Sequence, residues 1–268
     1  MKNKTLEKIK TIIGNKKTRH HLEEELNAII AKLEKGAELE QNDYDVINEY
    51  CGSYDANKKT KVIEELVLSS GKAKEIFYYA LYVKSCNVNQ AEEKICETRN
   101  AENLFSFAKY IKGANIRKLS EVCAETCDPE FIYLFATLKG ADMRKLSEGM
   151  AKSGNAEYIL KFAHLEDSNK TVLSKGMSKT NDAERILMFA KEIDNADIKV
   201  LTDGIIKTKN PAAIYSFASA IKKADKQVLQ EAEIATRNKT YIEKFAKHIE
   251  GNTINLDEVE FEDNRFLG

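Results

Sequence analysis

One set of basic side chains recurs at a regular interval along the chain and is its clearest candidate for a binding surface. The set consists of Lys152, Lys179, Lys207, Lys209 and Arg237. The first three occupy one position of a repeating pattern, and the last two lie two residues further on in theirs. A row of cations is suited to bind phosphates or an acidic protein partner. The row is therefore a candidate partner-binding edge.

A structural interpretation of the same cations is the one we favour. Cations in the last turn of a helix stabilise it by complementing the helix dipole. Glu148 and Asp203 precede Lys152 and Lys207 by four residues, which is the spacing of ordinary ion pairs on a helix surface. Earlier repeats carry glutamate at the lysine position, which also argues against a continuous binding track.

Three glycines share another position of the pattern. Gly149, Gly176 and Gly204 lie within predicted helices, and Ala232 follows in the same register. A glycine inside a helix costs about 1 kcal/mol relative to alanine, so some group must approach closely there. We predict a tight crossing against a neighbouring helix. The alternative is that the backbone of a ligand lies on this smooth strip, which would make the glycines part of the partner-binding set.

No pattern in the sequence predicts an active site. Paired carboxylates, a catalytic triad and a phosphate-binding loop cannot be placed on the predicted helices. The five cysteines lack the paired spacing of a zinc site, and the four histidines form no metal motif. We therefore predict a protein that is not an enzyme, with no catalytic residue, metal, cofactor or small-molecule substrate.

A Phe-Ala pair returns every 27 or 28 residues and marks the first helix of a structural repeat. The pairs begin at Phe107, Phe135, Phe162, Phe189, Phe217 and Phe245. Seven residues earlier stands an Asn or Asp, whose side chain can cap the first turn. These caps are Asn100, Asp128, Asn155, Asp182, Asn210 and Asn238. Pro129 and Pro211, the two prolines of the chain, directly follow two of them, at the helix position that best tolerates proline.

A second helix follows in each repeat after a tight turn. Its predicted caps are Asn87, Asn115, Asp142, Asn169, Asp197, Asp225 and Asn252. An apolar residue stands four positions after each cap. A short period that carries two helices is the signature of a stacked helical repeat.

The predicted fold class is all-α: a right-handed α-solenoid of about eight helix-turn-helix repeats with an N-terminal helical cap. We place the cap at residues 1–40, with helices from Thr5 to Ile13 and from Thr18 to Leu33. The repeats are predicted at 41–262, and a C-terminal tail at 263–268. The segment from Leu256 to Asp263 is predicted to be a degenerate last helix.

Two short helices per repeat, with a Phe-Ala pair in the first and a leucine in the second, resemble the HEAT-like and armadillo-like helical repeats over residues 42 to 262. The units of those families are usually longer than the 27 or 28 residues of this chain. The resemblance implies an extended scaffold that binds another macromolecule.

Composition narrows the functional classes. A net charge of −1 argues against a globally basic nucleic-acid binder. No apolar run has the length of a membrane span or a secretory leader, and the scattered cysteines favour a reducing cytoplasm.

The leading hypothesis is a cytoplasmic scaffold that binds a protein or ribonucleoprotein along its groove. The second is nucleic-acid binding through the basic edge, and the third is a phage-encoded or mobile-element-encoded inhibitor of a host defence complex.

Overall fold

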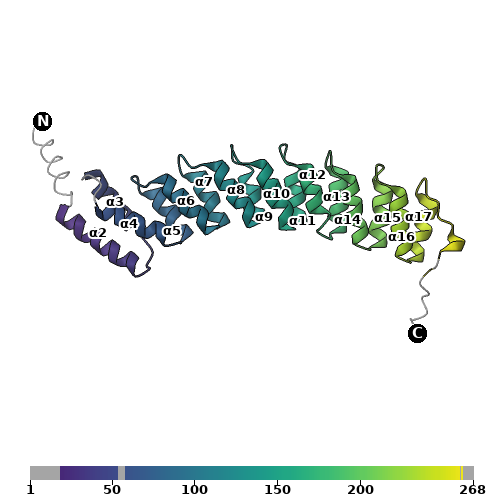
Figure 1. Ribbon diagram of the computed structural model, residues 1–268, viewed down its shortest axis with the longest axis horizontal. Helices are drawn as coiled ribbons and strands as arrows, with labels where there is room; N and C mark the ends of the chain where they lie inside the picture. The colour runs from purple at the N-terminus through teal and green to yellow at the C-terminus, as the bar shows by residue number, and fades with distance from the viewer. Residues whose placement is uncertain (1–18, 54–57, 260, 262–268) are drawn as a thin grey trace, which may run out of the picture. The chain divides into compact units, whose positions relative to one another are not determined.

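The computed structural model describes residues 19–53, 58–259 and 261. All regular secondary structure in these residues is helical, with sixteen α-helices, one 3-10 helix and no strand (Figure 1). The all-α prediction is therefore confirmed. The chain forms two compact units, residues 1–115 and residues 116–268.

The described helices of the first unit are α2 (Arg19–Glu34), α3 (Gln41–Ser53), α4 (Lys58–Ser69), α5 (Ala73–Tyr82), α6 (Val88–Thr98) and α7 (Ala101–Tyr110). Those of the second unit are α8 (Ile116–Thr126), α9 (Pro129–Phe135), α10 (Met143–Ser153), α11 (Ala156–Ala163), α12 (Lys170–Met177), α13 (Ala183–Glu192), α14 (Ile198–Lys207), α15 (Pro211–Ala220), α16 (Lys226–Ala235), α17 (Lys239–His248) and the 3-10 helix η1 (Leu256–Glu258). The helix predicted from Thr18 to Leu33 corresponds to α2. The one predicted from Thr5 to Ile13 lies outside the described residues.

Side-chain caps start the odd-numbered helices from α7 onward where the sequence places them. In α11, the Asn155 side-chain oxygen accepts a hydrogen bond from the Tyr158 N–H at 3.1 Å. Equivalent caps are confirmed at Asn100, Asp128, Asp182, Asn210 and Asn238. Each cap satisfies an N–H that the first turn of a helix leaves without a partner. The caps therefore fix where each of these helices begins.

Five even-numbered helices, α6, α10, α12, α14 and α16, are capped in the same way, and the cap predicted at Asn115 for α8 stays a prediction. Caps are confirmed at Asn87, Asp142, Asn169, Asp197 and Asp225. The prediction for Asn252 is wrong: its Nδ2 donates to the carbonyl oxygens of Ala246 and Ile249, so it satisfies the end of α17. Of the degenerate helix predicted from Leu256, the described residues form only the single turn of η1.

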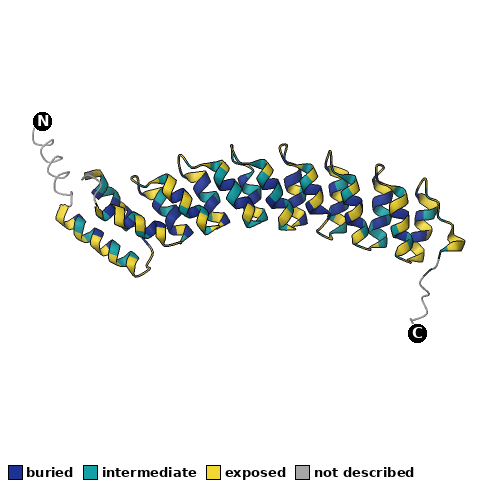
Figure 2. Ribbon diagram, viewed as in Figure 1, coloured by how far each residue is buried: buried dark blue, intermediate teal, exposed yellow. Residues whose placement is uncertain are grey.

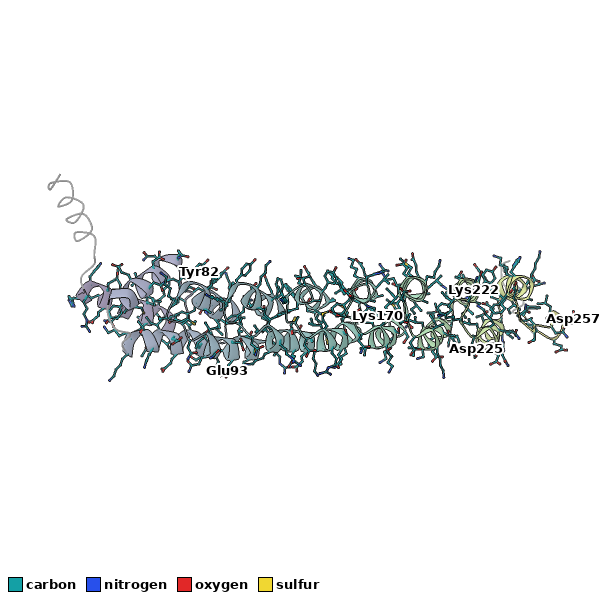
Figure 3. All side chains as sticks on the ribbon, turned by 90° about the horizontal axis from the view of Figure 1, so that it is seen from above. Tyr82, Glu93, Lys170, Lys222, Asp225 and Asp257 are labelled. Atoms are coloured by element: carbon teal, nitrogen blue, oxygen red, sulfur yellow. The ribbon has the colours of Figure 1, made fainter. Side chains whose placement is uncertain are left out.

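In the second unit, the described helices pack in two rows. Each even-numbered helix from α8 to α14 contacts the next even-numbered one, and each odd-numbered helix from α9 to α15 contacts the next odd-numbered one. Figure 3 shows these two rows from above. In the first unit, α2 contacts α4, α4 contacts α6, and α5 contacts α7. At these steps, helices that are two apart in sequence therefore lie side by side within each unit.

The phenylalanines of the Phe-Ala pairs form the centre of the core. Those of the second unit have no exposed surface, and they are Phe135, Phe162, Phe189, Phe217 and Phe245. The even-numbered helices contribute leucines that are equally buried, Leu146, Leu173, Leu201 and Leu229 among them. Figure 2 shows that the helices carry both a buried and an exposed side. Burial of each such side chain stabilises the fold by roughly 1.5–3 kcal/mol.

A ladder of hydrogen bonds runs from polar residues of the even-numbered helices to a backbone N–H that lies 22 or 23 residues later in the chain. The Ser147 hydroxyl of α10 accepts a hydrogen bond at 3.0 Å from the backbone N–H of Asn169, which caps α12. Equivalent bonds join Glu64 to Asn87, Glu92 to Asn115, Ser120 to Asp142, Ser174 to Asp197, and Gln230 to Thr253. The ladder was not predicted from the sequence. Its signal is a polar residue directly after the buried apolar residue of each even-numbered helix.

The turn from an even-numbered helix to the next odd-numbered one is also built from a repeated residue. In the turn before α13, the Thr180 hydroxyl donates to the Met177 carbonyl oxygen at 2.8 Å and accepts from the Asp182 N–H at 3.3 Å. The same two bonds are made by Thr98, Thr126, Ser153, Thr208 and Thr236. One hydroxyl thus satisfies the end of one helix and orients the cap of the next.

Candidate functional site

The three lysines that form the predicted basic edge lie at the same end of successive even-numbered helices. Lys152 is in the last turn of α10, Lys179 lies two residues beyond the end of α12, and Lys207 is the last residue of α14. All three are exposed. None of them forms an ion pair with a described residue. Their charges are therefore available to a partner.

The helix-surface pairs expected for two of these lysines are not formed. Glu148 pairs instead with Arg144 at 2.9 Å and with Lys145 at 3.4 Å. Asp203 forms no ion pair with a described residue, so Lys207 is also left without the expected neighbour. The helix-dipole part of the structural interpretation still applies, because Lys152 and Lys207 lie in the last turn of their helices.

A groove between α10 and α12 brings two lysines of the edge together with a third. The groove has a volume of about 410 Å³, and its charged lining residues are Glu148, Lys152, Lys175 and Lys179. Because Glu148 is held by cations outside the groove lining, the three ammonium groups make the groove positive. Lys175 was missed in the sequence, although it precedes Lys179 by four residues, the spacing of neighbours on one helix face.

The two other basic residues of the predicted set have an unusual backbone. Lys209 and Arg237 are exposed and adopt the left-handed conformation, with φ of 52° and 56°. This conformation costs a residue with a Cβ roughly 1–2 kcal/mol, and glycine is the usual residue at such a helix end. Gly154 occupies the equivalent position after α10, with φ of 68°. Lys209 and Arg237 thus occupy positions where a glycine backbone would be less strained.

Replacing Lys209 by glycine is expected to raise the free energy of unfolding by about 1 kcal/mol, because the strain of the left-handed conformation is removed. Urea denaturation followed by circular dichroism measures the change. Lys207→Gly is the matched control, and we expect it to lower stability by up to about 1 kcal/mol because glycine has a low helix propensity and Lys207 belongs to α14. A loss of stability in Lys209→Gly would contradict the strain argument.

The three glycines lie where even-numbered helices cross one another. A Cβ placed on Gly149 would lie 2.3 Å from the carbonyl oxygen of Ala124. A Cβ on Gly176 would lie 2.6 Å from the Cα of Ala151 in α10. A Cβ on Gly204 would lie 2.8 Å from the Cα of Ser178, which directly follows α12. All three glycines are buried, which is the geometry of a tight helix crossing. Gly176 also borders the groove between α10 and α12.

Glu233 of α16 is a buried titratable residue that was missed in the sequence. It is 0% exposed, and neither carboxylate oxygen has a hydrogen-bond partner among the described residues. Burial raises the pKa of Glu233 to about 7, although contacts with the Thr236 side chain and the Tyr215 backbone act in the opposite direction. The sequence does contain a signal for it, because the equivalent position of the preceding even-numbered helices carries an apolar residue or cysteine. These residues are Ile95, Cys123, Met150, Met177 and Ile205.

Other groups with potential chemistry are dispersed. Within the described ranges, no three or more His, Cys, Asp or Glu residues are grouped so that they could hold a metal ion. Burial raises the pKa of the Cys123 thiol to about 12, so this thiol is protonated at neutral pH. None of the described helices combines the length and the apolar character needed to cross a bilayer.

Comparison with known proteins assigns no family to the chain. No family model matches it, and no curated protein or solved structure matches it either.

Proposed function

We propose that this chain is a non-enzymatic cytoplasmic scaffold that binds a protein or ribonucleoprotein partner along the row of even-numbered helices. In this proposal the two units continue one right-handed α-solenoid of about eight repeats, preceded by an N-terminal helical cap. The observation that carries it is the set of exposed lysines on and beside α10, α12 and α14, none of which has an ion-pair partner among the described residues.

The regular packing of the even-numbered row supports this role. Neighbouring helices of a row lie roughly 8–10 Å apart, so the lysines are presented at a similar interval. The hydrogen-bond ladder between Ser147 and Asn169, and between Ser174 and Asp197, holds that interval. An extended anionic partner can therefore contact several cations at once. Such charges speed association and select a partner of complementary charge more than they add affinity.

A capture experiment tests the proposal. Tagged full-length protein is incubated with native lysate, with and without nuclease, and the bound proteins are identified by mass spectrometry. The triple variant Lys152→Glu, Lys179→Glu, Lys207→Glu is compared in parallel. We expect a partner that the wild type captures to be reduced at least tenfold with the variant, since each substitution replaces attraction by repulsion.

The matched control replaces three exposed lysines of the odd-numbered row and its turns by glutamate. They are Lys139, Lys191 and Lys247. This control carries the same change of net charge, so we expect it to retain the partner. Equal capture by both triple variants would contradict a role for the basic edge. Unchanged circular dichroism spectra of both variants show that the fold is preserved.

Direct nucleic-acid binding is a second candidate, favoured by the convergence of Lys152, Lys175 and Lys179 on one groove. Lysine binds phosphate as a compact point charge and needs no fixed geometry. Fluorescence anisotropy with a labelled single-stranded oligonucleotide tests it. Binding should weaken as salt rises, with a slope that drops by about 0.7 for each lysine removed from a phosphate contact. Absence of binding at 50 mM salt would exclude this candidate and leave the protein-binding proposal standing.

A further inference from the structure

The C-terminal end of the second unit contains a carboxylate in an apolar position. Glu233 lies near the end of α16, which packs against α14, α15 and α17. The equivalent residue of α12, Met177, is 0% exposed, and Glu233 is buried to the same extent. Both of its oxygens lack a hydrogen-bond partner among the described residues. An ionised carboxylate in such a place is strongly disfavoured.

No cation compensates this buried acid. Every Asp, Glu, Lys and His on the three helices packed against α16 is exposed at the surface. These groups are Lys199, Asp203 and Lys207 on α14, and Lys239, Glu243, Lys244, Lys247 and His248 on α17, whereas α15 carries none of these residue types. Two partly buried tyrosines, Tyr215 and Tyr241, are the other titratable groups of these helices. The Thr236 hydroxyl, which donates to the Glu233 backbone carbonyl oxygen, and the Tyr215 backbone lower the pKa of Glu233, but burial outweighs them.

The packing of α16 on α14 also lacks the hydrogen bond found at the other steps of the row. The Thr202 hydroxyl, which stands in the ladder position, donates to the Ile198 carbonyl oxygen at 2.8 Å. No ladder bond to the Asp225 N–H is formed. A crevice of about 320 Å³ opens between the two helices, and Thr202, Asp225 and Val228 are among its lining residues. The helix that carries the buried acid thus lacks the ladder bond to the preceding helix of its row, whereas Lys226 at its start donates to the carbonyl oxygens of Ala218 and Ile221 at the end of α15.

We propose that α16 and α17 form a pH-sensitive latch, which is packed on α14 and α15 while Glu233 is protonated and opens when its carboxylate ionises. Opening exposes the carboxylate to water, which removes the cost of its burial. The end of the odd-numbered row then separates from the rest of the second unit. This device is independent of the proposed partner-binding edge.

The direction of the pH dependence follows from linkage. The pKa of Glu233 is raised in the folded state from an ordinary value of 4.5 to about 7. The folded state therefore binds more protons than the open state between these values, and its stability falls as pH rises. The stabilising effect is fully present below pH 4.5 and is lost as pH rises through 7. For a shift of this size, the opening equilibrium constant increases roughly 30-fold between pH 5.5 and pH 8.5.

Native-state hydrogen exchange of the full chain at pH 5.5, 7 and 8.5 tests the latch. After correction for the intrinsic exchange rates, amides of α16 and α17 in the wild type should show that increase in opening. The Glu233→Met variant, which restores the residue type of the Met150 and Met177 positions, should remain closed across the range. Glu233→Gln removes only the charge and should behave in the same way.

Two controls make the result specific. Glu231→Gln neutralises an exposed acid on the same helix and should keep the wild-type pH dependence. Amides of α10 and α12, where the ladder bond is complete, should change much less in every variant. Equal opening of α16 in the wild type at pH 5.5 and 8.5 would overturn the proposal. Parallel pH dependence in the wild type and Glu233→Met would overturn it as well.

Discussion

Replacing Gly149 by alanine is expected to lower the free energy of unfolding by about 2–3 kcal/mol, although alanine favours helices over glycine by about 1 kcal/mol. The added Cβ would lie 2.3 Å from the Ala124 carbonyl oxygen and 2.8 Å from the Ala124 Cα. These are backbone atoms of α8, so α8 and α10 must move apart. Separation of the helices also stretches the bond between Ser120 and Asp142, which is 2.9 Å long.

The measurement is guanidinium-induced unfolding, followed by circular dichroism. Gly52→Ala is the matched control because Gly52 lies in α3, has no atom within 4 Å of an added Cβ and does not have a positive φ. We expect this control to be neutral or to gain up to about 1 kcal/mol. If Gly149→Ala were stabilising as well, the close crossing of α8 and α10 would be disproved.

Replacing Phe189 by alanine is expected to cost about 3–5 kcal/mol. Phe189 is 0% exposed on α13, between helices of both rows. Truncation removes the buried ring and leaves a cavity that short, capped helices cannot close without losing their hydrogen bonds. Unfolding in guanidinium chloride measures the loss, and hydrogen exchange locates it. Stability in stacked helices depends on neighbouring elements, so amides of α11 to α15 should be the most affected.

The adjacent residue provides the control for Phe189. Met188 is on the same helix and is 37% exposed. Met188→Ala removes a large apolar side chain from the surface, so we expect a loss below about 1 kcal/mol. Similar losses for Phe189→Ala and Met188→Ala would contradict the assignment of the Phe-Ala phenylalanine to the core.

Much of the local structure follows from the sequence, because it depends on interactions between residues that are close in the chain. An Asn or Asp seven residues before a core phenylalanine caps a helix wherever it can reach the N–H groups of the next turn. The same local reach explains Pro129 and Pro211. Asn252 is the exception: it lies in a cap register, but no α-helix begins after it in the described residues, the single 3-10 turn of η1 is capped by Asn255, and the Asn252 side chain turns back to α17. A register predicts a cap only if a helix follows.

The candidate site was predicted less well, because its properties depend on which helices become neighbours. The basic row is visible in the sequence, but the ion pair of Glu148 with Arg144 and Lys145 leaves Lys152 without its expected partner. The groove that joins Lys152 to Lys175 and Lys179 exists only once α10 packs beside α12. The spacing of residues along one helix does not indicate which other helix packs beside it.

The sequence by itself determined the period, the helical class, the caps and the core phenylalanines of this protein. Each of these depends on contacts within one helix or on a hydrophobic repeat. The tertiary structure alone decided which backbone atoms Gly149 approaches, the ladder at Ser147 and the burial of Glu233. The physical reason is that clashes, hydrogen bonds between helices and desolvation depend on two surfaces in contact. The residues of one helix do not determine which surface packs against it.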